Sequence, residues 1–360
     1  MPAFPSRQLG LAFDLRGCPS ACRHCYLGSA VAPYVPQDEM EPLTEQFRQY
    51  RRDGEEGAYF ARISVASWFH EPDYAPNYRE LRTLEERLSG GEAPPREYLS
   101  TWRLAREPEY AAWARSVGLE TCRLSFYGVG ETHNWFARRK GAYEDHLAAL
   151  PRMLDAGIAP AIQVFLTRKS LPELGKLMHA LEELRLPERT EALGKPFVLF
   201  LRTPMPTGDA RRIEYLRPTL EEVEGCIPEP LVESSRRHRQ VNELWQTEAE
   251  WCRQAAARPE TFPSAHPEPE EVWFLVSGRF DVYPNMGTLE PWWKLGNLKR
   301  QSVAALVEAY ETNRPMGLAV NYGVSARQLV ERTGRPESRR IYDSLSDLLS
   351  LYLARWCEKS

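Results

Sequence analysis

Three cysteines crowded into one short stretch limit what this chain can become. Cys18, Cys22 and Cys25 lie four and three positions apart, although the chain has only 7 cysteines among its 360 residues. Soft thiolates packed this closely are typical of iron–sulfur or zinc ligation. A zinc ion or an ordinary cubane cluster needs four ligands, and this stretch supplies three. Three thiolates on a four-iron cluster would leave one iron open to a group that is not protein. A zinc knuckle or three buried thiols is the alternative.

Charge and hydropathy exclude several classes of protein. The formal net charge is -4, which argues against nucleic acid as a partner. No apolar run approaches the roughly 20 residues of a membrane span, and the N-terminus lacks the apolar segment of a signal peptide. An odd number of cysteines, partly clustered, fits metal binding in a reducing compartment better than disulfides. The sequence therefore predicts a cytoplasmic protein without a membrane partner.

Strand-like and helix-like segments alternate through the first two hundred residues. The predicted strands are 8–14, 61–66, 98–101, 120–127, 161–166 and 197–201, and the predicted helices are 42–56, 78–89, 107–117, 143–156 and 171–184. This alternation is typical of an α/β fold with a parallel sheet. About six units fall short of an eightfold barrel and favour an open, partial (β/α)6 barrel. The cysteines follow the first strand, which is where such barrels carry their chemistry.

The rest of the chain is expected to divide into two further regions. Residues 1–215 would form the barrel, 216–270 a helical segment with a Pro-rich linker, and 271–360 a C-terminal extension of mixed hairpin and helix. A hairpin is predicted over 272–284 with its turn at Ser277-Gly278. The basic run at 236–239 is expected to be a solvated helix face, or else a docking surface for an acidic electron donor or peptide.

The cysteine stretch resembles the radical S-adenosylmethionine (SAM) superfamily. Its Cys-x3-Cys-x2-Cys spacing, with the ring of His24 just before the last cysteine, carries the resemblance. The resemblance implies one [4Fe-4S] cluster on Cys18, Cys22 and Cys25, whose open iron chelates the amino and carboxylate groups of SAM. It also implies that His24 lies against the adenine; a solvated loop histidine is the alternative.

A second match follows the second predicted strand. His70-Glu71-Pro72 resembles the Gly-Gly-Glu-Pro of the superfamily, whose acid meets the SAM ammonium group. A carboxylate facing an ammonium is a charge-assisted contact that selects that group. Phe69 and His70 stand where the two glycines would be. The resemblance assigns Glu71 to the SAM amino group; a surface glutamate before a turn proline is the alternative.

The block from Leu124 to Tyr143 resembles the SPASM/Twitch group of the superfamily. The resemblance implies that Ser125 contacts the ribose and that Arg138, with Arg139 beside it, pairs with the SAM carboxylate through a bidentate guanidinium. A solvated basic turn is the alternative for these arginines. Gln163 is expected either to point into the barrel toward SAM or to pack. Arg202 is expected to meet a substrate carboxylate or to cap the barrel rim.

The C-terminal hairpin departs from that group. The segment Tyr283-Pro284-Asn285 followed by Leu295-Gly296-Asn297 resembles a SPASM domain in which Asn285 replaces a cluster cysteine. An amide is a poor iron–sulfur ligand. This predicts a degenerate SPASM-like region without an auxiliary cluster. It would act as a substrate lid using Tyr283, Asn285, Trp292 and Trp293, or as a stabilising cap.

The resemblance implies an enzyme that cleaves SAM reductively and uses a 5′-deoxyadenosyl radical to abstract hydrogen. Its reductant would be a flavodoxin or ferredoxin. Maturation of a ribosomal peptide is the first expectation, although the chain starts almost directly at its first strand, without a leader-binding domain. Oxidation, epimerisation or rearrangement of a small sugar or amino acid derivative is the second. A non-catalytic metal-binding module is the third.

Overall fold

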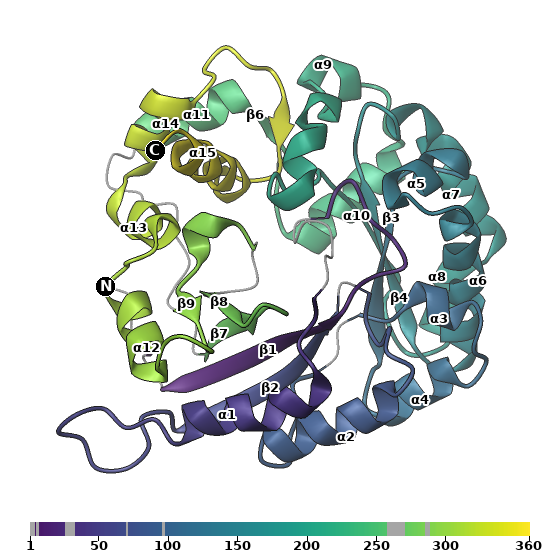
Figure 1. Cartoon of the computed structure of the whole chain (residues 1–360). Coiled ribbons are helices and arrows are strands. Elements are labelled where there is room, and N and C mark those ends of the chain that lie inside the picture. Colours follow the sequence, from purple (N-terminus) through teal and green to yellow (C-terminus); the bar gives the residue numbers. More distant parts are fainter. Residues whose placement is uncertain are drawn as a thin grey trace.

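The computed structural model describes residues 4, 7–25, 33–69, 71–95, 98–257, 271–284 and 289–360, and within them the chain forms an α/β partial barrel (Figure 1). The barrel strands are β1 (Gln8–Arg16), β2 (Arg62–Phe69), β3 (Thr121–Phe126), β4 (Ala159–Phe165) and β5 (Val198–Arg202). β1 pairs with β2, β3 with β4, and β4 with β5, always in parallel. The predicted α/β class with parallel sheets is confirmed.

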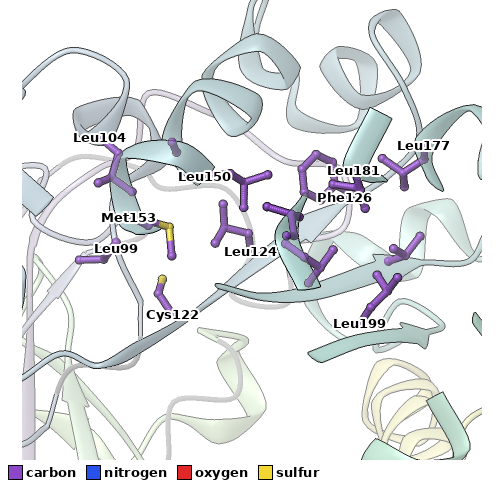
Figure 2. Close-up of a cluster of buried hydrophobic side chains, with 14 of the residues drawn as sticks. Leu99, Leu104, Cys122, Leu124, Phe126, Leu150, Met153, Leu177, Leu181 and Leu199 are labelled. Atoms are coloured by element: carbon purple, nitrogen blue, oxygen red, sulfur yellow. The ribbon is translucent and has the colours of Figure 1, made fainter. Parts of the chain in front are cut away.

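Helices connect these strands and cover their outer faces. The connecting helices are η1 (Gln37–Glu39), α1 (Met40–Arg48), α2 (Tyr78–Leu88), α3 (Thr101–Leu104), α4 (Tyr110–Ser116), α5 (Glu131–Ala137), α6 (Ala142–Asp155), η2 (Leu171–Glu173), α7 (Leu174–Glu183) and α8 (Leu186–Glu191). Alternate residues of a strand point to opposite faces. Leu124 and Phe126 of β3 pack outward with Leu150 of α6 and Leu177 of α7 in one apolar cluster (Figure 2). The intervening residues of β3–β5 therefore face the barrel interior.

The predicted third strand at 98–101 is wrong. Ser100 instead caps α3, and its Oγ accepts a hydrogen bond from the Arg103 backbone N–H at 3.0 Å. A serine hydroxyl satisfies one of the free N–H groups at a helix start, and this local bond prevails over the β-propensity of the preceding residues. The barrel strands β1–β5 consequently fall into two separate sheets, because β2 and β3 are not paired, and no closed barrel is found among the described strands.

The C-terminal hairpin extends the barrel sheet beyond β1. β7 (Glu271–Val276) and β8 (Asp281–Pro284) are antiparallel, as predicted. β7 also pairs in parallel with β1, so that with β9 (Gly296–Asn297) the order is β2-β1-β7-β8-β9. This pairing depends on Gly10, because a Cβ there would lie 2.1 Å from the Trp273 ring. No sequence pattern predicted that β7 would pair with β1.

Segments after β5 occupy the remaining arc of the ring in Figure 1. They are η3 (Gly208–Leu216), α9 (Leu220–Val223), α10 (Glu229–Arg239), β6 (Gln246–Thr247), α11 (Glu248–Ala257), η4 (Pro291–Trp293), α12 (Val303–Glu311), α13 (Met316–Gly323), α14 (Ala326–Thr333), β10 (Ile341–Tyr342) and α15 (Leu345–Lys359). Helices therefore predominate in the described parts of the segment after residue 215, and the C-terminal region combines a hairpin with helices, as predicted.

Three contacts attach this arc to β5. Ser235 Oγ accepts the Leu201 N–H at 2.9 Å and Ser234 Oγ donates to the Leu199 carbonyl at 2.5 Å, so α10 covers the open edge of the strand. Arg202, at the end of β5, pairs with Asp343 at 2.6 Å.

The predicted boundaries after residues 215 and 270 stay a prediction, and nearly all of the Pro-rich linker lies outside the described residues. Among the helices of the described ranges, none combines the length and the apolarity that crossing a membrane requires.

Candidate active site

The cysteine stretch is held against the C-terminal end of α5. Helix ends leave backbone carbonyls without intrahelical partners. Here the Phe136 carbonyl accepts the Arg23 N–H at 2.8 Å, and the Ala137 carbonyl accepts the Ala21 N–H at 3.2 Å. On the other side of the stretch, the Asp209 N–H donates to the Cys25 carbonyl at 2.9 Å. The stretch from Cys18 to Cys25, hereafter the cysteine loop, is thus fixed at both ends.

The three cysteines hinder one another's ionisation, because a negative charge on one thiol raises the pKa of its neighbours. Burial, and then the charge of Glu71, raise the pKa of Cys18 to about 12. Burial and the neighbouring Cys18 and Cys25 raise the pKa of Cys22 well above its usual range. Three neighbouring thiolates therefore need a cationic centre to hold them ionised.

This donor set fits an iron–sulfur cluster better than a single ion. In the described ranges no three His, Cys, Asp or Glu side chains converge closely enough to hold one metal ion. A four-iron cluster instead takes each thiolate on a different iron, so the sulfurs need not meet at one point. Cys18, Cys22 and Cys25 are free, half-buried thiols that could each bind a different iron.

Glu71 lies at this site, directly after β2. Its Oε1 accepts hydrogen bonds from Ser100 Oγ at 2.7 Å and from the Trp102 N–H at 3.4 Å. Burial raises the pKa of Glu71, and these two donors oppose the increase. Ser100 and Trp102, at the start of α3, therefore hold the Glu71 carboxylate in place. Ser100 was not foreseen as a site residue, because a helix cap carries no functional signature.

Arg139, rather than Arg138, reaches the cysteine loop. Arg138 adopts a left-handed conformation (φ 50°) where α5 ends, and its side chain is exposed. This turn directs Arg139 back, and its Nε donates to Ser20 Oγ at 3.0 Å. The Arg139 charge opposes the rise in the pKa of Cys18, of Cys22 and of Glu71, which places it near all three. Asp145 pairs with Arg139 and fixes its orientation.

His24 belongs to an aromatic stack at the same end of the barrel. Its ring lies 3.9 Å from that of Tyr127, which in turn stacks on Phe165 at 5.0 Å and 6°. The Tyr127 hydroxyl contacts His24 Nε2, while His24 Nδ1 is buried without a hydrogen-bond partner. Burial lowers the pKa of His24 to about 3, so its ring is neutral. The cysteine loop thus contains one ring nitrogen, His24 Nδ1, that has no hydrogen-bond partner among the described residues.

Ser125 and Gln163 lie side by side on the inner face of β3 and β4. They are paired in register, and Phe200 of β5 is the partner of Gln163 on its other side. Ser125 is half-buried and Gln163 is buried. The structure therefore brings both predicted residues to the interior, one layer below Tyr127 and Phe165.

Other predicted residues lie elsewhere or outside the described ranges. Arg202 is paired with Asp343 rather than free for a substrate carboxylate. Tyr283 packs on the inner face with Leu275, Trp273 and Trp293, whereas Trp292 belongs to the helical C-terminal cluster. His70 and Asn285 lie outside the described residues. A hollow of about 260 Å³, lined by Leu220, Val232 and Trp245 among others, includes no residue of the cysteine loop.

No protein-family model matches the chain, and no curated protein matches its sequence. Solved structures do resemble it. Native anSMEcpe with bound AdoMet and the Kp18Cys peptide aligns with a TM-score of 0.54 at 12% identity, over 98% of this chain and 96% of that chain. Native anSMEcpe with AdoMet and the Cp18Cys peptide aligns with a TM-score of 0.54 at 12% identity, over 98% of this chain and 97% of that chain. Native anSMEcpe with AdoMet aligns with a TM-score of 0.52 at 13% identity, over 98% of this chain and 97% of that chain.

At such low identity the likeness defines the fold alone. The chain therefore shares the α/β fold of the anSMEcpe structures over nearly its whole length.

Proposed function

We propose that this chain is a radical SAM enzyme with a single [4Fe-4S] cluster on Cys18, Cys22 and Cys25. What carries the proposal is the grouping of three mutually repelling thiols with Glu71 and Arg139 at the strand ends of this fold. When bound, the cluster supplies an electron to SAM, whose cleavage gives methionine and a 5′-deoxyadenosyl radical that removes a hydrogen atom from the substrate.

The chain's own residues would hold SAM by charge and shape. Glu71 would accept hydrogen bonds from the SAM ammonium group, and Arg139 would donate to the SAM carboxylate. The planar guanidinium of arginine can donate two parallel hydrogen bonds to one carboxylate. His24 would lie against the adenine, and its Nδ1 has no hydrogen-bond partner among the described residues. Ser125 and Gln163 would face the ribose from the inner wall.

Two experiments test the cofactor assignment. Anaerobically reconstituted protein should be brown, carry about four irons per chain, and release 5′-deoxyadenosine from SAM with dithionite. Cys22→Ala should lose both iron and cleavage, whereas Cys226→Ala, at an exposed cysteine, should lose neither. A colourless zinc protein, or cleavage that survives Cys22→Ala, would contradict the proposal.

The carboxylate assignment has its own test. A hydrogen bond to a charged group is worth about 1.5–3 kcal/mol, so Arg139→Ala should weaken SAM binding about 10- to 100-fold. Arg138→Ala separates the two candidates, because the larger loss marks the carboxylate ligand. Equal losses at both positions, or a larger loss at Arg138, would return the role to Arg138.

For the substrate we propose a peptide. The support is the likeness to anSMEcpe, whose structures hold peptides, together with the inner-face apolar wall of Trp273, Leu275 and Tyr283. Peptides that increase 5′-deoxyadenosine release over the SAM-only rate would support this. Stimulation by sugars or free amino acid derivatives alone would favour the second candidate, modification of a small molecule. For the reductant we propose a flavodoxin or ferredoxin.

A further inference from the structure

Four cations beside the cysteine loop have no carboxylate partner. Arg23 is half-buried, and Arg138, Lys140 and Lys169 are exposed; we call these four residues the loop-side patch. Within the described ranges, none of the four forms an ion pair with an acidic side chain. Two of their chain neighbours are paired: Arg139 with Asp145, and Arg168 with Glu222 at 2.9 Å. Unlike these two neighbours, the four patch cations have no carboxylate beside them in the described ranges.

Trp135 lies at the centre of the loop-side patch. The Arg23 guanidinium lies 4.1 Å from the centroid of its ring, and the Lys169 ammonium lies 4.8 Å from it. Arg23 Nε also donates to the Trp135 carbonyl at 3.1 Å. Cation–π contacts orient the two side chains without neutralising either charge. One cation from the cysteine loop and one from the turn after β4 thus lie over the same half-buried indole, next in the chain to Arg138 and Lys140 at the end of α5.

The loop-side patch adjoins the proposed cluster ligands through the backbone. Arg138 directly follows Ala137, whose carbonyl accepts the Ala21 N–H at 3.2 Å and lies 3.9 Å from Cys22 Sγ. Arg23 is itself the residue after Cys22. A protein bound on the patch would therefore sit against the loop through which an electron must reach the cluster.

We propose that the loop-side patch docks an acidic one-electron carrier protein of the flavodoxin kind, an inference that rests on the proposed function. Charge complementarity carries it, because the chain as a whole has a net charge of -4 and this surface is locally positive. Electron-transfer partners use small, transient interfaces in which charge sets the encounter rate. A flat, cationic surface with one aromatic side chain at its centre suits that type of contact.

The basic run of α10 is the competing surface. Arg236 and Arg237 are exposed on α10, which lies along β5, and no hydrogen bond joins that helix to the cysteine loop in the described ranges. Arg236 also has a carboxylate 3.8 Å away on Glu229. A carrier bound there would not touch the loop.

The test compares charge reversals on the two surfaces. Lys140→Glu/Lys169→Glu should reduce flavodoxin-supported SAM cleavage about tenfold or more at low ionic strength, within the range by which steering accelerates association. Cleavage driven by dithionite, a small reductant, should stay unchanged. The affinity of oxidised flavodoxin for the reconstituted protein should fall by a similar factor and lose most of its salt dependence. Arg236→Glu/Arg237→Glu makes the same change of charge and should alter none of these values.

The outcomes separate the docking proposal from the function on which it rests. If dithionite yields no 5′-deoxyadenosine from the unaltered protein, the proposed function fails, and flavodoxin affinity still tests the surface. If the Lys140/Lys169 variant keeps both its flavodoxin-supported rate and its flavodoxin affinity, the docking proposal is refuted. A loss found only in the Arg236/Arg237 variant would also refute it and would assign the carrier to α10.

Discussion

Asp14 gives the sharpest test of the barrel interior. It lies near the end of β1 on the face opposite Phe13, is 3% exposed, and its Oδ1 has no hydrogen-bond partner. Burial raises the pKa of Asp14 from its ordinary 3.8 to about 7. This buried carboxyl, whose Oδ1 has no partner among the described residues, is therefore held neutral by the folded chain at pH values where the unfolded chain ionises it.

The sign and size of the effect follow from linkage. Between pH 3.8 and about 7 the folded chain keeps a proton that the unfolded chain has lost, so stability falls as pH rises through that window. Each pH unit in this window lowers the free energy of unfolding by about 1.4 kcal/mol, so the whole window lowers it by about 4 kcal/mol. Asp14→Asn, which is neutral throughout, should gain stability over the unaltered chain by about 3 kcal/mol more at pH 8 than at pH 5.

Thermal unfolding of the cluster-free protein measures this gain. At about 2.1 cal/mol/K per residue, the unfolding entropy of a 360-residue chain converts 3 kcal/mol into a Tm difference of roughly 4 °C. Asp53→Asn, at an exposed aspartate, is the control and should show no such pH dependence. A Tm difference between Asp14→Asn and the parent that stays constant from pH 5 to pH 8 would show that Asp14 ionises normally.

Three further outcomes are expected from the packing. Gly10→Ala places a Cβ against the Trp273 ring and should destabilise the chain by about 1–3 kcal/mol in urea unfolding; an unchanged midpoint would contradict the close β1–β7 approach. Ser100→Ala removes the cap of α3 and a hydrogen bond to Glu71, and should cost about 1–2 kcal/mol of stability, whereas Ser100→Thr keeps the hydroxyl and should cost less. A chain ending at residue 257 should lose its near-ultraviolet circular dichroism and bind a hydrophobic dye; native-like spectra would show that the barrel folds alone.

The sequence was informative where chemistry or periodicity is local. The cysteine loop follows the first strand as predicted, and most strands and helices of the barrel appear with ends shifted by a few residues. Helix α1 ends at Arg48 rather than at 56 because the polar segment after it turns at Gly54, whose φ is 79°. Such boundaries depend on caps and turns that propensity describes poorly.

Long-range contacts and single dihedral angles could not be predicted from the sequence. Arg138 and Arg139 are adjacent, and only the left-handed conformation of Arg138 decides which of them returns to the cysteine loop. The strand expected at 98–101 was lost to a side-chain cap at Ser100. Pairing of β7 with β1 joins residues more than 250 positions apart, which no local pattern encodes.

That pairing changes how the C-terminal region should be understood. Leu9, Leu11 and Phe13 of β1 share one apolar core with Phe274 of β7 and with the buried face of α12. On the opposite face, Ala12 packs with Leu275 and Tyr283. A strand that contributes to both faces of the barrel sheet is part of the barrel's own structure. The hairpin therefore stabilises β1, the strand that carries Asp14 and leads into the cysteine loop. Any role it has as a substrate lid comes in addition to that structural one.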